Sequence, residues 1–133
     1  MKRLTLLLGM LVALVLLFAG TGCQSKDKGG PKELLDRFFS SAVSQDYASA
    51  YACYYAPYVA KVGKEDYVKH RKEASVLQSY RIVSVKQEGD NSAHAEVQLT
   101  FAPSEKLHRP EAVSTTVQEE LIKEGGDWKI KVW

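Results

Sequence analysis

Residues 93–101, Ala-His-Ala-Glu-Val-Gln-Leu-Thr-Phe, decide the fold, because apolar and polar side chains alternate along them without interruption. Successive side chains of a β-strand point to opposite faces, so this stretch predicts a strand with one dry and one wet face. Residues 80–85 are rich in β-branched side chains, and the polar residues 88–92 between the two stretches are typical of a turn. The sequence therefore predicts an antiparallel hairpin over residues 80–101.

Two more strands follow a polar loop from Ala102 to Val113. Residues 114–123 form the third predicted strand, Gly125-Gly126 a turn, and the alternating Trp128, Ile130 and Val132 the closing strand. Four consecutive strands joined by turns and one loop predict an antiparallel meander. Its dry face is expected to pack on whatever precedes it in the chain.

The preceding residues have the spacing of helices. After Pro31, apolar residues recur one turn apart and predict a helix with a broad buried stripe: Leu34, Leu35, Phe38, Phe39, Ala42 and Val43. Asp46 is a candidate cap for a shorter helix that carries tyrosines at 47, 51, 54 and 58 and that Pro57 is expected to end. Residues 64–74 predict a third, mostly charged helix with a narrow buried face. The fold class predicted is α+β, with N-terminal helices packed in a curved four-stranded antiparallel meander.

Charge is concentrated in the N-terminal segment. The chain of 133 residues is too short for several domains and carries 18 basic and 16 acidic residues. Lys2 and Arg3 stand before an apolar run, and without residues 1–22 the basic residues number 18 − 2 = 16, which equals the number of acidic ones. A neutral domain lacks the basic surface that binding to nucleic acid requires, so no nucleic-acid partner is expected.

The N-terminus itself has the three parts of an export signal. Lys2-Arg3 is followed by the apolar run 4–18 and by the small residues 19–22, directly before Cys23. The segment 19–23 resembles the lipobox of bacterial lipoproteins, which implies cleavage before Cys23 and acylation of that cysteine, palmitate included. The implied location is the cell membrane or outer membrane, facing outside the cytoplasm. An uncleaved signal anchor is the alternative, because about 20 apolar residues suffice to cross a bilayer.

The domain organisation follows from this segment. Residues 1–22 are the expected signal peptide, residues 23–30 a polar, glycine-ended tether, and residues 31–133 the folded domain. With Cys23 acylated, Cys53 is the remaining thiol of two, and no disulfide within the chain is possible. We expect Cys53 to be packed as a small apolar residue.

Nearly all of the predicted domain, residues 31–133, resembles a family. Residues 34–39, 45–51, 80–85 and the Gly-Asp-Trp-Lys hairpin within 124–130 resemble the landmarks of small nuclear-transport-factor-2-like domains, which many bacterial lipoproteins of unknown function carry. The resemblance implies a curved sheet wrapped around helices as a cone, often with a pocket inside. It also implies a possible homodimer through the sheet. Because the family holds isomerases, dehydratases, transport adaptors and binding modules, it leaves the function open.

Enzymes of this family place an acid or histidine on the concave sheet, and Glu119 is the candidate here. It stands between Val117 and Leu121, which makes it a buried carboxylate in a regular strand, whereas a bulge at Glu119-Glu120 would expel it. His94 and Glu96 share the wet face, and His70 and His108 stand in polar surroundings. No zinc-hydrolase or serine-hydrolase motif and no phosphate loop occurs, so no metal and no cofactor is expected.

Five of the seven tyrosines lie between residues 47 and 58. Such a stripe lines a ligand pocket or simply packs a short helix, and Tyr55, which lies off the stripe, is expected to face solvent or a partner. The expected ligand-binding residues are Tyr51, Tyr54, Tyr58, Phe101, Glu119 and Trp128. We favour a membrane-tethered, non-catalytic domain that binds a small apolar molecule or an envelope protein. A small isomerase or dehydratase that uses Glu119 is the alternative.

Overall fold

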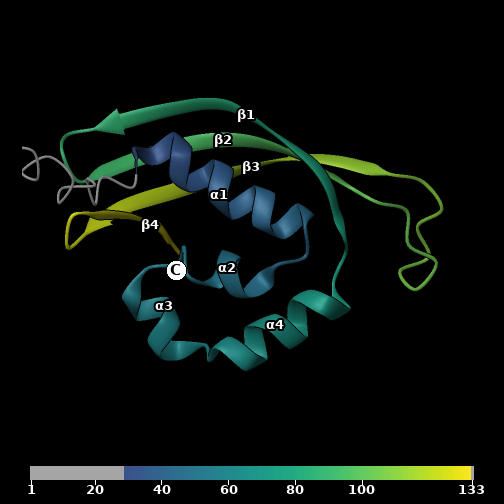
Figure 1. The fold of residues 1–133 in the computed structure, drawn as a ribbon. Coiled ribbons are helices and arrows are strands. Elements are labelled where there is room, and N and C mark those ends of the chain that lie inside the picture. Colours follow the sequence, from purple (N-terminus) through teal and green to yellow (C-terminus); the bar gives the residue numbers. More distant parts are fainter. Residues whose placement is uncertain (1–28, 133) are drawn as a thin grey trace, which may run out of the picture.

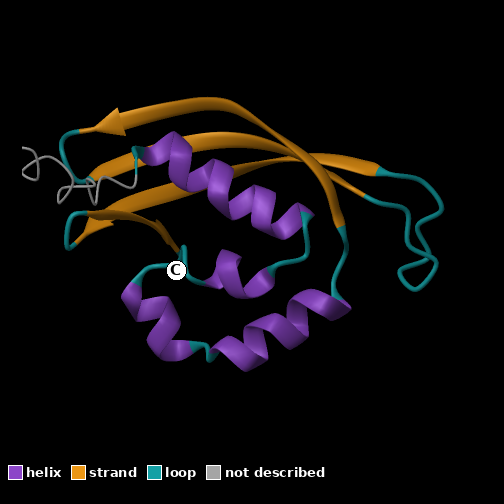
Figure 2. Cartoon of the chain, viewed as in Figure 1, coloured by secondary structure: helices purple, strands orange, loops and turns teal. Residues whose placement is uncertain are grey.

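The computed structural model describes residues 29–132, in which four helices precede a four-stranded sheet (Figures 1 and 2). The α+β order predicted from the sequence is confirmed. The signal peptide, Cys23 and most of the tether lie outside the described residues. Within residues 29–132 no helix is long and apolar enough to span a bilayer. The elements are α1 (Pro31–Val43), α2 (Tyr47–Tyr51), α3 (Ala56–Lys61), α4 (Lys64–Glu73), β1 (Leu77–Glu88), β2 (Ser92–Phe101), β3 (Val113–Glu124) and β4 (Asp127–Lys131).

The sheet is the predicted antiparallel meander, with strand order β1-β2-β3-β4. Val97 is at its centre, paired with Ile82 on one side and Val117 on the other. Gly125 and Gly126, both at positive φ (56° and 87°), form the two-residue turn between β3 and β4. A turn with two such residues favours glycine and matches the right-handed twist of the strands that it joins.

All four helices lie on one side of the sheet, which arches over them (Figure 1). The alternation of β2 places Ala93, Ala95, Val97 and Leu99 on this inner face, all buried. The stripe of α1 packs against them, and its predicted members Leu34, Leu35, Phe38, Phe39 and Ala42 are buried too. One core therefore joins α1 to the sheet, as predicted, with Leu121, Trp128 and Ile130 from the later strands.

One helix prediction is wrong. Instead of one helix over residues 47–58, α2 ends at Tyr51, and Pro57 lies in the first turn of a separate helix, α3. The chain between them turns at residues 52 and 53 and then pairs with β4. The Ile130 amide donates to the Cys53 carbonyl (2.8 Å), and the Tyr55 amide donates to the Ile130 carbonyl (3.0 Å). Proline is tolerated in a first turn, where its missing N–H costs no hydrogen bond, so Pro57 can begin a helix as readily as end one.

The other local predictions for this half hold. The Asp46 carboxylate accepts a hydrogen bond from the Ser49 amide (3.1 Å) and so caps α2. In α4 the buried face is as narrow as predicted, with Tyr67 its buried residue. Cys53 is a free thiol buried in the core, 1% exposed, and lies just past the end of α2.

Candidate functional site

Glu119 lies on the inner face of the sheet. The β2–β3 register runs without interruption through Val97–Val117, Ala95–Glu119 and Ala93–Leu121, so β3 is regular here and no bulge expels the side chain. Of the two alternatives that the sequence leaves open, the regular strand is the one found. Glu119 is half-buried, between two strand positions whose side chains belong to the core.

The carboxyl group of Glu119 has no hydrogen bond and no ion pair within residues 29–132. Burial raises its pKa above the usual value, because the charged form loses hydration and gains no donor in exchange. Tyr54 is its phenolic neighbour. The pKa of Tyr54 is raised as well, chiefly by burial, then by Tyr67, with a smaller contribution from the charge of Glu119.

Tyr54 is the centre of an aromatic group that we call the tyrosine cluster: Tyr47, Tyr51, Tyr54, Tyr58 and Tyr67. The Tyr54 ring centroid lies 4.5 Å from that of Tyr58, 5.5 Å from that of Tyr67 and 5.3 Å from that of Phe38, the last edge-on. The cluster joins α2, α3 and α4 to one another, and through Phe38 to α1. Most of its apolar surface is therefore used in packing.

The hydroxyl groups of Tyr51 and Tyr55 are used for structure. Tyr51 Oη lies 2.6 Å from the Val62 carbonyl oxygen and 3.1 Å from that of Val59, so it holds α3. Tyr55 is half-buried and its hydroxyl donates to the Val132 carbonyl, so the expectation that it faces solvent or a partner is wrong. The reason is the pairing of this segment with β4, which turns Tyr55 toward the end of the chain.

The predicted ligand-binding residues divide into two groups. Glu119, Tyr54 and Tyr58 are neighbours through Tyr54, and Tyr51 belongs to the same cluster. Phe101 and Trp128 lie far from each other, since Phe101 pairs with Val113 and Trp128 with Lys123, ten residues further along β3, or about 33 Å. Arg109 covers the Phe101 ring (6.0 Å) and Lys123 the Trp128 ring (5.9 Å).

A lone desolvated carboxyl group makes the stability of the domain depend on pH. The folded pKa of Glu119 is raised, so the unfolded chain releases this proton first. The protonated Glu119 contributes its full stability at pH values below its pKa in the unfolded chain. That contribution is lost as the pH rises through the pKa of Glu119 in the folded protein. We expect Glu119→Gln, which stays neutral, to be more stable relative to the wild type at pH 7 than at pH 4.

Urea titrations of both proteins at the two pH values measure this effect, and the difference between the proteins cancels the other titrating groups. A carboxyl-carbon NMR titration of Glu119 gives a second, direct readout. The prediction is wrong if the wild type and Glu119→Gln differ by the same free energy at pH 4 and pH 7.

The outer face of the sheet is polar, as the alternation of β2 predicts, and in Figure 2 none of the helices covers it. Cross-strand hydrogen bonds join Arg81 to Gln98 (3.0 Å) and Gln118 to Glu96 (3.0 Å), and the hydroxyls of Thr100 and Ser114 are 2.9 Å apart. His94 lies on this face 3.4 Å from Glu88. These side chains are already held in place before any partner arrives.

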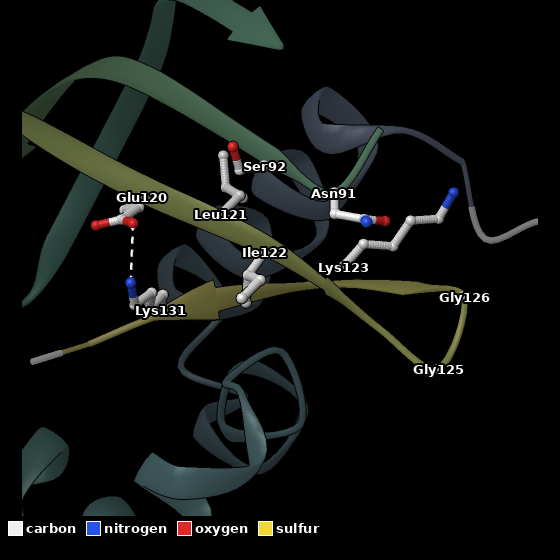
Figure 3. A pocket seen from close by; sticks show the side chains of 9 residues that line it. All are labelled: Asn91, Ser92, Glu120, Leu121, Ile122, Lys123, Gly125, Gly126 and Lys131. Atoms are coloured by element: carbon white, nitrogen blue, oxygen red, sulfur yellow. Dashed lines mark hydrogen bonds and ion pairs between the residues drawn. The ribbon is translucent and has the colours of Figure 1, made fainter. Parts of the chain in front are cut away.

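An open depression of about 620 Å³ lies along the β3–β4 hairpin, from its turn to the Glu120–Lys131 pair (Figure 3). On its outer-face side, Lys131 Nζ contacts Glu120 Oε1 at 3.0 Å, and both side chains are mostly covered. The sequence reading missed this feature. Its lining residues are Asn91, Ser92, Glu120, Leu121, Ile122, Lys123, Gly125, Gly126 and Lys131.

Within residues 29–132 no three His, Cys, Asp or Glu side chains come together as a metal site would require. His70 and His108 are exposed. The candidate site is thus the Glu119–Tyr54 pair on the inner face, and the candidate interaction surface is the outer face of the sheet.

Comparison with known proteins identifies the fold. No protein-family model and no curated protein matches the chain. A solved SEC-C motif containing protein from Rhodopseudomonas palustris is similar in structure, with 13% identity over 77% of this chain and 75% of that chain and a TM-score of 0.62. Another, from Psychrobacter arcticus, has 10% identity over 74% of this chain and a TM-score of 0.58, and this chain spans 56% of its length.

A ketosteroid isomerase-like protein from Erwinia carotovora atroseptica is also similar, with 15% identity over 79% of this chain and 91% of that chain and a TM-score of 0.54. The fold is nuclear-transport-factor-2-like. The architecture that the sequence resemblance implied is therefore confirmed. At these identities the likeness extends to the nuclear-transport-factor-2-like fold and not to a shared activity.

Proposed function

We propose that the protein is an extracytoplasmic lipoprotein, anchored through Cys23, whose nuclear-transport-factor-2-like domain binds an envelope protein without catalysing a reaction. The observation that carries the proposal is the placement of all four helices on the inner face, which leaves the outer face of the sheet uncovered (Figure 2). The sequence supports the anchor, because Cys23 directly follows an export signal.

One property of the outer face and one of the inner face favour a protein partner. Its polar side chains are paired across strands, as Gln118 with Glu96 and Arg81 with Gln98, so ordering them on binding costs little further entropy. The inner face, by contrast, is packed by α1 and by the tyrosine cluster, and a small apolar ligand there would compete with the Phe38–Tyr54 contact. A second copy of the chain is one form that the partner can take.

Site-specific photo-crosslinking in intact cells tests this proposal. A benzophenone side chain would replace Ser84 or Thr116, both exposed on the outer face, and Lys106 in the loop beyond β2 would be the control. We expect a discrete crosslinked protein from the two outer-face positions and none from Lys106. A ladder of adducts equal at all three positions, or none at any, would contradict the proposal.

Glu119 supports a second candidate function, a small isomerase or dehydratase. A carboxyl group whose pKa burial raises toward neutrality is suited to general acid–base catalysis, and Tyr54 beside it could donate a hydrogen bond. We expect a screen of ketone isomerisation and dehydration substrates to give no turnover above background. Turnover that Glu119→Gln abolishes, in a variant that still folds, would establish the enzyme instead.

A further inference from the structure

Helix α3 is apolar and yet buries none of its residues. Five of its six residues are uncharged and largely apolar, and Ala56, Pro57, Val59 and Ala60 are all exposed, Val59 at 38%. A short helix normally owes its stability to burial of an apolar face against the protein. Here that face is turned away from the body of the domain.

The helix is held by its ends and by one ring. The Glu124 carboxylate accepts hydrogen bonds from the Ala56 amide (3.1 and 3.3 Å), at the start of α3. The Tyr51 hydroxyl holds the Val59 and Val62 carbonyls at the other end, and the Tyr58 ring packs on Tyr54. The protein therefore builds a fixed apolar surface, which is ready to bind without further ordering.

Basic side chains border this surface. Residues 56–74 carry five Lys or Arg and three Asp or Glu, and Lys61 and Lys64, at the end of α3 and the start of α4, are both exposed. Apolar side chains with flanking lysines suit the interface of a bilayer that contains anionic lipid.

The described chain begins on the same side of the molecule. In Figure 1, α1 starts at the end of the sheet that carries the β1–β2 and β3–β4 turns, and the loop of residues 102–112 projects from the opposite end. Glu124, which holds α3, directly precedes the β3–β4 turn. Cys23 stands six residues before Gly29, a reach of about 20 Å when extended. A lipid on Cys23 would keep this end of the domain close to the bilayer.

We propose that α3 docks on the bilayer that holds the anchor, with Val59 and its apolar neighbours at the lipid interface. This inference rests on the proposed lipoprotein anchor. The anchor also explains why the small apolar area of α3 is enough for docking. A tethered surface meets the bilayer at a high effective concentration, so even a weakly binding surface stays bound. Docking by α3 would orient the domain, with the 102–112 loop directed away from the lipid.

A fluorescent probe on α3 tests the inference in the full-length, acylated protein. The protein would be reconstituted into vesicles of phosphatidylethanolamine and phosphatidylglycerol, with the environment-sensitive dye NBD on Val59→Cys or, as control, on Lys106→Cys. Cys53 is buried and should not react with the dye. With doxyl-labelled lipid we expect roughly a twofold loss of emission from the Val59 probe and none from the Lys106 probe.

Two further arms decide between outcomes. Lys61→Gln with Lys64→Gln should reduce the quenching at Val59, since it removes the basic border. Vesicle flotation measures separately whether the lipid anchor attaches the protein to the vesicles. A protein that floats while its Val59 probe stays in water overturns the docking of α3 alone, as it would if α3 bound a protein instead. A protein that does not float overturns both this inference and the lipoprotein proposal.

Discussion

Replacing Phe38 with alanine is expected to lower the free energy of unfolding by about 3 to 5 kcal/mol. Phe38 is 8% exposed, and its ring centroid lies 4.9 Å from that of Phe39 and 5.3 Å from that of Tyr54, both edge-on. It thus joins the α1 core to the tyrosine cluster. Truncation removes apolar burial, leaves a cavity under the sheet and breaks the contact between these two parts of the core.

A urea titration followed by circular dichroism measures this loss, with Leu107→Ala as the matched control. Leu107 is 46% exposed in the loop beyond β2, and its truncation should change stability by less than about 0.5 kcal/mol. A loss below about 1 kcal/mol for Phe38→Ala would show that α1 does not pack on the sheet as described.

Replacing Cys23 with serine is expected to abolish the lipid modification of the protein completely. Acylation would place at least two chains in the bilayer, and each buried CH₂ contributes about 0.8 kcal/mol, so the attachment is effectively permanent. Serine removes the acceptor thiol and leaves the apolar run 4–18 intact. The variant should still be exported, but it should lose its labelled fatty acid and fail to mature at residue 23.

The matched control is Cys53→Ser. Cys53 is buried in the core, so its replacement should leave both the labelled fatty acid and the membrane attachment unchanged. Mass spectrometry of the membrane-bound wild type decides between the two readings of the N-terminus. A chain that begins at an unmodified Met1 would establish the uncleaved anchor and refute the lipoprotein.

The strands were predictable because their pattern is local. Strict alternation in 93–101 fixes which face each residue of β2 presents, and the paired glycines at 125–126 fix the last turn. The same alternation continues in β3, and because that strand has no bulge at Glu119, it places Glu119 on the inner face. The helix stripe of α1 was predictable for the same reason, since its spacing depends on no distant contact.

The region around Pro57 was not predictable, because it depends on residues more than 70 positions away. Helical spacing of the tyrosines continues past Tyr51, but the Cys53–Tyr55 segment pairs with Ile130 and is drawn out of the helix. The candidate site was not predictable for the same reason, because Tyr54 lies near Glu119 only as a result of the pairing with Ile130. The depression along the β3–β4 hairpin likewise depends on how the β1–β2 turn, at Asn91, meets that hairpin.

The bridge between Tyr54 and Ile130 also covers part of one edge of the sheet. An unpaired sheet edge is a template on which chains can add strand by strand. The bridge lies at Ile130, near the C-terminal end of β4, which is one of the two edges. The other edge, β1, is broken by register shifts at 77–79 and 82–84, which leaves only short runs of regular backbone. We therefore expect the domain to resist strand-by-strand association through its sheet even at high concentration.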